Sequence, residues 1–150
     1  MKTYITAFIG LMAAALFLAS CCTLSKRKTN REVPYTVAQR YFVKNDVAQL
    51  PNGAITTEQE FYSLFGQATA MGTDGRPTQI NFQRQFVIAV TVPPTDTDTD
   101  IEPVALHQYA NSLVLTYSVS RGEQRSYTIQ PLLLLVVDKK YEGTVELRQQ

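Results

Sequence analysis

Three aspartates alternate with threonines in the middle of the chain, in a spacing that suits a cation. Asp96, Asp98 and Asp100 stand at positions i, i+2 and i+4. In an extended segment such carboxylates share one face, and Ca²⁺ takes six to eight oxygen ligands. An EF-hand loop also needs glycine where Ile101 stands and glutamate where His107 stands. We therefore expect a solvated loop and no cofactor, with calcium binding as the alternative.

The single histidine, His107, is the natural general base if the chain is an enzyme. Ser118 and Ser126 are the serines that would serve it as nucleophiles. Neither serine lies in a G-x-S-x-G turn, the chain has no glycine-rich phosphate loop, and the domain has no second His or Cys for a metal. We therefore predict no catalytic residue and no enzyme, and a small envelope hydrolase remains the alternative.

Aromatic and basic side chains lie near the ends of predicted strands, at Arg125-Ser126-Tyr127 and at Tyr141. Such groups suit contact with a peptide or a glycan. We take Tyr127, together with Asp96, Asp98 and Asp100, as candidate binding residues.

Cys21 and Cys22 follow an apolar leader at the start of the chain. Lys2 precedes the apolar stretch from Tyr4 to Leu18, which is too short for a comfortable membrane span and has the flanks of a signal peptide. The run Leu18-Ala19-Ser20-Cys21 resembles the lipobox of bacterial lipoproteins. The resemblance implies cleavage before Cys21 and lipidation of its thiol.

Charge is distributed unevenly along the chain. The tail from Thr23 to Arg31 holds four basic residues and no acid, whereas the chain from Glu32 onward has nine basic and thirteen acidic residues, a net charge of −4. A nucleic-acid-binding domain would carry a basic face on the fold itself, so that class is excluded. Cys22 stands where aspartate favours inner-membrane retention, and Lys26-Arg27-Lys28 replace the acidic residues of surface-displayed lipoproteins. The resemblance therefore implies the periplasmic face of the outer membrane.

Hydrophobic periodicity predicts mostly strands after the tail. Thr57 to Gly66 is the exception, a short amphipathic helix with a capping box at Thr57 and Glu60 and with Gly66 at its end. The segments from Gly66 to Arg84 and from Pro93 to Asp100 are expected to be loops. Asn111-Ser112 and Arg121-Gly122-Glu123 are expected turns, and Pro131 marks a bulge or a change of partner. The expected strands are Tyr35–Lys44, Phe86–Val92, Ile101–Tyr109, Leu113–Ser120, Tyr127–Val137 and Thr144–Arg148.

These elements predict a mainly β (α+β) fold. Residues 1–20 are the expected signal peptide, 21–32 a lipidated flexible tether, and 33–150 a single small domain. We expect an antiparallel sheet or sandwich of about five or six strands with one short N-terminal helix. Leu132 to Val137 is apolar on both faces and should be a central strand.

From Thr57 onward the order of elements resembles the C-terminal-like domain of the protease-complex subunit (PrcB) lipoprotein family. The similar features are Ile55 to Phe61, Ile80-Asn81-Phe82 leading into Phe86 to Val90, and the apolar strand Leu132 to Val137. The chain departs from the pattern after the Phe86 strand, where that family has a Gly-Gly-Tyr-like loop. The resemblance implies a non-enzymatic accessory module that binds another envelope protein.

The function expected from the sequence is therefore a membrane-anchored envelope lipoprotein that acts as a non-catalytic protein-binding module. Its partner would be an envelope protein, either a protease or the substrate of one, met through the loop at Pro93 to Asp100 or the loop at Gly66 to Arg84. The alternatives are the hydrolase built on His107 and a glycan- or calcium-binding accessory lipoprotein.

Overall fold

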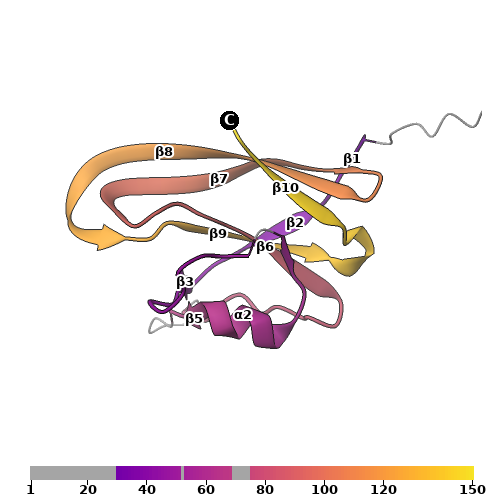
Figure 1. The fold of residues 1–150 in the computed structure, drawn as a ribbon, viewed down its shortest axis with the longest axis horizontal. Coiled ribbons are helices and arrows are strands. Elements are labelled where there is room, and N and C mark those ends of the chain that lie inside the picture. The colour runs from indigo at the N-terminus through magenta and orange to yellow at the C-terminus, as the bar shows by residue number, and fades with distance from the viewer. Residues whose placement is uncertain (1–29, 52, 69–74) are drawn as a thin grey trace, which may run out of the picture.

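The frame of the fold is one long antiparallel β-ribbon that folds back on itself (Figure 1). One side of the ribbon is β6 (Gln85–Thr91) continued by β7 (Thr95–Tyr109), and the other is β8 (Ser112–Ile129) continued by β9 (Leu132–Asp138). β6 pairs with β9 and β7 with β8. The structure is a computed structural model that describes residues 30–51, 53–68 and 75–150.

The two halves of the ribbon belong to different sheets. Sheet A has the order β1-β7-β8-β10, and sheet B has the order β2-β9-β6-β4. β10 pairs with β8 in parallel, whereas the other pairs are antiparallel. The strands at the sheet edges are β1 (Asn30–Glu32), β10 (Thr144–Gln149), β2 (Tyr35–Ala38) and β4 (Ala54–Ile55).

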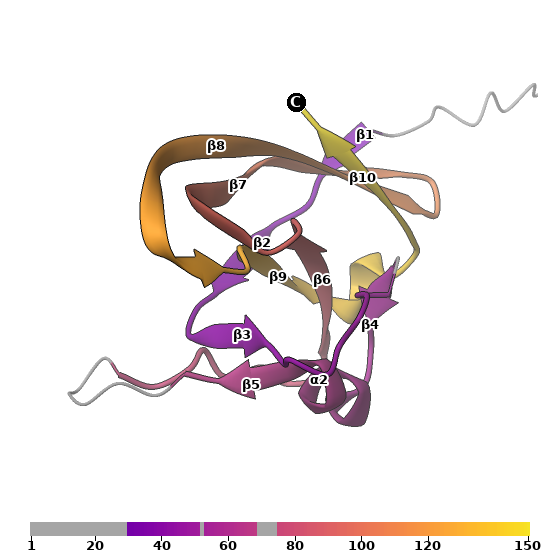
Figure 2. The same ribbon diagram turned by 60° about the vertical axis from the view of Figure 1, so that its left-hand side comes forward.

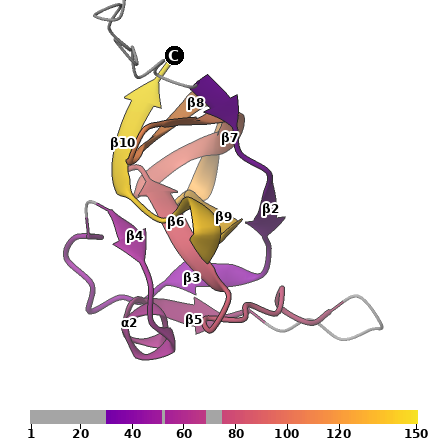
Figure 3. The same ribbon diagram turned by 90° about the vertical axis from the view of Figure 1, so that its right-hand side faces the viewer.

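Sheet B is the middle of three layers (Figures 2 and 3). Sheet A covers one of its faces. The other face is covered by helix α2 (Glu58–Leu64) and by the small sheet of β3 (Tyr41–Val43) and β5 (Phe65–Gln67). One buried cluster, which includes Phe86, Ile88, Leu106, Leu113 and Leu135, lies between the two large sheets. A second cluster, with Ile55, Phe61, Phe65, Val87 and Leu134, lies beneath the helix.

The position of β9 follows from its composition. Leu133 and Leu135 contribute to the cluster between the large sheets, while Leu134 and Val136 contribute to the cluster beneath the helix. A strand that is apolar on both faces must be covered on both faces. β9 accordingly lies between β2 and β6, which confirms its prediction as a central strand.

The predicted first strand is divided in two. The backbone of Arg40 has a φ of 68°, a left-handed conformation that ends an extended run. β2 before this residue pairs with β9, and β3 after it pairs with β5. The expectation of one strand over Tyr35–Lys44 was therefore wrong, because the bend sends the chain from sheet B to the covering layer.

The predicted helix is confirmed at its start and shorter at its end. Thr57 is the N-cap, and its Oγ1 accepts a hydrogen bond from the Glu60 amide at 3.2 Å, as a capping residue should. The chain then passes directly from α2 into β5, so Gly66 is a strand residue and not a helix cap. A Cβ at Gly66 would collide with the ring of Phe42, so any other residue there would require this half-exposed ring to move.

Two further predictions about turns were wrong. Thr95 to Asp100, expected as a loop, is the first part of β7, and Arg121-Gly122-Glu123, expected as a turn, lies within β8. Shifts in the β7–β8 register at these positions show that bulges absorb the irregularity. The hairpin expected at Asn111-Ser112 is confirmed, with Ala110 and Asn111 between the strands and a φ of 55° at Ala110.

Pro131 stands where the chain leaves sheet A for sheet B, which confirms the predicted change of partner. The opposite side of the ribbon bends at Pro93-Pro94, between β6 and β7. Proline has no amide hydrogen to donate to a ladder, so both sides of the ribbon stop pairing at this bend. The fold-back therefore has a local cause in three prolines.

The mainly β class and the single small domain are confirmed, and residues 30–51, 53–68 and 75–150 contain one short α-helix, as expected. The paired structure begins at Asn30, three residues before the expected boundary at 33, because β1 pairs with the Tyr109 end of β7. No helix within the described ranges has both the length and the apolar character that a membrane crossing requires.

Candidate functional site

The part of the β7–β8 ladder next to the proline bend, at the opposite end from the hairpin turn, has only two strands, and we call it the arm, residues 95–102 and 118–129. The partner strands of sheet A stop short of it, since β1 pairs only with residues 107–109 of β7 and β10 only with residues 112–117 of β8. Residues 120–128 of β8 are all exposed. The candidate binding residues Asp96, Asp98, Asp100 and Tyr127 all lie on this arm.

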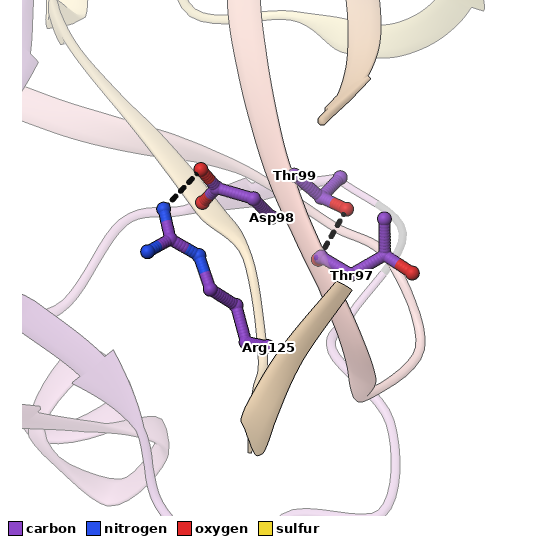
Figure 4. A network of polar contacts seen from close by, with 4 residues as sticks. All are labelled: Thr97, Asp98, Thr99 and Arg125. Atoms are coloured by element: carbon purple, nitrogen blue, oxygen red, sulfur yellow. Dashed lines mark hydrogen bonds and ion pairs between the residues drawn. The ribbon is translucent and has the colours of Figure 1, made fainter. Parts of the chain in front are cut away.

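An ion pair crosses the arm between Asp98 and Arg125 (Figure 4). The Arg125 guanidinium donates to Oδ2 of Asp98 at 2.5 Å. This hydrogen bond, together with the carboxylate charge, raises the pKa of Arg125. Both side chains are about half exposed, at 45 % each, so solvent screens the pair. The contact orders the two strands without making a buried charged site.

The remaining candidates on the arm face solvent individually. Oδ2 of Asp96 accepts a hydrogen bond from the Gln124 side chain at 2.7 Å. Asp100 is exposed, and Tyr127 is 58 % exposed. Within residues 30–51, 53–68 and 75–150, no group of three His, Cys, Asp or Glu side chains is arranged to hold a metal ion. The arm therefore brings the predicted residues onto one element but does not converge their carboxylates.

His107 lies at the other end of β7, away from the arm. It pairs with Val114 of β8 and with Glu32 of β1. Ser118 is four residues further along β8 than Val114, about 13 Å at strand spacing, and Ser126 is further still. The Nδ1 atom of His107 is buried and has no hydrogen-bond partner among the described residues. The register thus separates the histidine from both candidate nucleophiles.

A groove lies at the bend of the ribbon, and we call it the corner groove. Its volume is about 260 Å³, and it runs between the segment 47–50 and the bend at residues 91–94. Its walls combine apolar side chains with a few polar ones, and none of the described residues that line it is charged. The principal lining residues are Val47, Leu50, Val92, Pro93, Pro94 and Gln130.

Three further hollows adjoin the corner groove and share lining residues with it. One of about 210 Å³ shares Gln49, Leu50 and Thr91 with it and extends to Tyr117 and Leu147. Another of about 230 Å³ shares the two prolines and reaches Thr95, Thr99 and Arg121 at the base of the arm. An open hollow of about 450 Å³ shares Leu50 with the corner groove and extends to Glu60. Among the described residues that line these four hollows, the charged ones are Glu60 in the open hollow and Arg121 at the base of the arm.

Sequence reasoning found part of this site. The Pro93 end was expected in a binding surface, although as a loop and not as the bend of a ribbon. The segment from Val47 to Pro51 was missed, because it contains no chemically distinctive residue and shows no periodicity. Leu147 was read only as part of a last strand, and its exposed fraction of 38 % is the feature that places it on a surface.

The lipidation candidate, Cys21, lies outside the described residues. The comparisons with known proteins add no relative: no family model, no curated protein and no solved structure matches this chain.

Proposed function

We propose that this protein is a lipid-anchored envelope module that holds an extended segment of a partner protein in the corner groove. The groove carries the proposal, because its uncharged walls suit aliphatic, aromatic or proline side chains of a polypeptide in extended form. The adjoining hollows would receive neighbouring side chains of the same segment. The module acts by binding and not by catalysis.

The charge of the arm indicates which side chains the partner should carry. The arm has five acidic residues and two basic ones, a net charge of −3. It rises directly from the Pro93-Pro94 end of the groove. A bound segment with apolar side chains at its centre and Lys or Arg on the arm side would match both surfaces. An accessory role beside an envelope protease, as the PrcB resemblance implies, fits such a segment.

Anchorage would come from Cys21 in the lipobox-like sequence. Each buried CH₂ contributes about 0.8 kcal/mol, and one acyl chain alone gives only marginal binding. A lipoprotein carries more than one chain, so its release becomes rare. We propose the periplasmic face of the outer membrane as the location of the module. Lipidation itself is tested by labelling with a radioactive fatty acid, which should mark the wild-type chain but not the Cys21→Ser variant.

Peptide selection tests the groove. A library of random peptides is selected on the purified protein, and the affinity of enriched peptides is measured by fluorescence anisotropy. Gln49→Glu and Pro94→Lys place charge on exposed lining residues, and we expect each to weaken binding at least about tenfold, since an unpaired charge would be desolvated. Gln83→Glu is the matched control, because Gln83 is exposed at the opposite end of β6.

Two outcomes would overturn the groove proposal. One is a selection that yields no peptide above background. The other is a set of peptides whose affinity is unchanged by Gln49→Glu and Pro94→Lys. Hydrolysis of model esters or peptides that disappears in a folded His107→Ala variant would favour the enzyme alternative.

A further inference from the structure

Two cations are fixed on one aromatic ring at the end of the domain opposite the arm. Tyr141 is the last residue of the short 3₁₀ helix η2 (Lys139–Tyr141), and its ring is buried against the cluster between the large sheets. The guanidinium carbon of Arg31 lies 5.3 Å from the ring centroid, and Nζ of Lys140 lies 5.0 Å from it. Both cations are attracted to the ring face, and both residues remain exposed.

Further basic groups adjoin this ring, and we call the set of Arg31, Arg84, Lys139 and Lys140 the basic end. The amide of Lys139 donates to the carbonyl oxygen of Arg84 at 2.8 Å, which places these two residues together. The acidic groups at this end are Asp138, whose carboxylate is 3.7 Å from Nζ of Lys140, and Glu142. Glu32 lies next to Arg31 and pairs with His107. Four basic residues thus stand against these three acidic ones around Tyr141, an excess of one positive charge.

The chain enters the fold at this same end. Asn30 pairs with Tyr109, next to the turn at Ala110-Asn111 (Figure 1). The amide of Thr144, at the start of β10, donates to the carbonyl oxygen of Asn111 at 3.0 Å. The sequence just before Asn30 contains Lys26, Arg27 and Lys28. In the sequence only Thr29 separates this basic run from Asn30, and nine residues of any conformation span at most about 30 Å.

The arm lies at the far end of β7 and β8 and carries the opposite charge. Residues 30–150 have ten basic and thirteen acidic residues, a net charge of −3. The arm alone accounts for this excess. The rest of the domain is balanced, so the molecule is polarised along its length.

We propose that the basic end rests on the anionic headgroups of the membrane that holds the lipid anchor. This inference depends on the proposed anchorage at Cys21. Lys and Arg close to an anionic surface are attracted to it, while the acidic arm is repelled. The domain then stands with its basic end at the bilayer, and the corner groove and the arm point toward the compartment where a partner would be met.

Site-directed fluorescence quenching tests this orientation. The full lipidated chain, in a Cys22→Ser background, carries one added cysteine for a fluorophore, either Asn111→Cys at the anchored end or Glu123→Cys on the arm. The protein is reconstituted in vesicles of phosphatidylcholine, with or without phosphatidylglycerol, that contain a headgroup spin label. We expect quenching at position 111 to exceed quenching at position 123 at least about threefold when phosphatidylglycerol is present, and the difference to shrink in high salt.

Charge neutralisation identifies the surface responsible. A variant with Arg31→Gln, Lys139→Gln and Lys140→Gln should lose the excess quenching at position 111 while its circular dichroism spectrum stays unchanged. Arg121→Gln with Arg125→Gln on the arm is the control and should keep the excess. Equal quenching at positions 111 and 123 in the wild-type background, or a triple variant that quenches like wild type, overturns the orientation.

The two proposals fail in different ways. A chain that does not float with any vesicle overturns the anchorage, and the orientation with it. A chain that floats normally but shows no preferred end overturns the orientation alone.

Discussion

Two parts of the ribbon, the inner half in sheet B and the arm, are paired in the same antiparallel way but are built from opposite kinds of sequence. In the inner half, β9 reads Leu-Leu-Leu-Leu-Val-Val-Asp, and five of its seven residues are buried. In the arm, β7 begins Thr-Asp-Thr-Asp-Thr-Asp, and only Thr99 is buried there. β-structure in the first case is stabilised by burial of both faces. In the second case it depends on continuity with the inner sheet, on β-branched threonines and on cross-strand polar pairs.

This difference indicates that stability and partner recognition depend on different parts of the molecule. A segment that is buried on both faces holds the three layers together and has no surface to offer. The arm stabilises little, so its residues are available for contact with a partner. The corner groove lies at the junction, where backbone held by the core meets exposed side chains.

The largest effect should come from the inner half. Leu135→Ala removes a fully buried side chain between the two large sheets, and we expect it to lower the free energy of unfolding by about 3 kcal/mol. Urea denaturation followed by circular dichroism measures the change. Val104→Ala is the control, since Val104 is 51 % exposed, and its effect should stay within about 0.5 kcal/mol. Similar losses for both variants would remove the contrast between core and surface.

Amide hydrogen exchange should distinguish the arm from the inner half of the ribbon directly. Amides of the arm at Thr97 and Thr99 should exchange at least about a hundredfold faster than those at Leu134 and Leu135, because the arm opens without disturbing the core. Exchange followed by mass spectrometry or NMR gives the rates. Equal protection of both regions would mean that the arm unfolds only with the whole domain.

A substitution at the junction between the two halves of the ribbon should have an intermediate effect on the free energy of unfolding. Oγ1 of Thr91 donates to the carbonyl oxygen of Pro131 at 2.6 Å and so links the two sides of the ribbon where it bends. Thr91→Val keeps the shape and β-propensity but removes this donor, and should cost about 1 kcal/mol in urea denaturation. Ser63→Ala, which removes an exposed hydrogen bond within α2, is the comparison variant. A Thr91→Val protein as stable as wild type would show that the prolines alone maintain the bend.

The smallest effect should come from the ion pair on the arm. A double-mutant cycle measures this pair, with the variants Asp98→Asn, Arg125→Gln and the double variant. The coupling free energy between the two sites should be barely resolvable and should decrease with added salt, because both side chains are half exposed. A coupling that is large and insensitive to salt would show that the arm is a more rigid structural element than its exposure indicates.

Local patterns in the sequence determined a substantial part of this fold. The alternation-free run Leu132 to Val137 required a strand covered on both faces, and β9 is such a strand. Thr57 with Glu60 defined the start of the helix, because capping depends only on residues within one turn. Pro131 marked the change of sheet, since proline cannot continue a ladder. For the site, the sequence indicated the arm's charged residues and the Pro93 end of the groove.

Only the tertiary structure decided which strands are neighbours. β10 pairs in parallel with β8, and Gly143 permits this because its Cα lies so close to the Asn111 carbonyl that a Cβ would collide with it. No local pattern encodes a contact between residues 111 and 143. The Thr-Asp repeat is predicted as a loop because aspartate is depleted in strands. Pairing with β8 nevertheless makes this segment a strand. Side-chain periodicity determines which residues are extended and which face is buried, whereas register, partner and the grooves between segments arise from contacts between residues far apart in the chain.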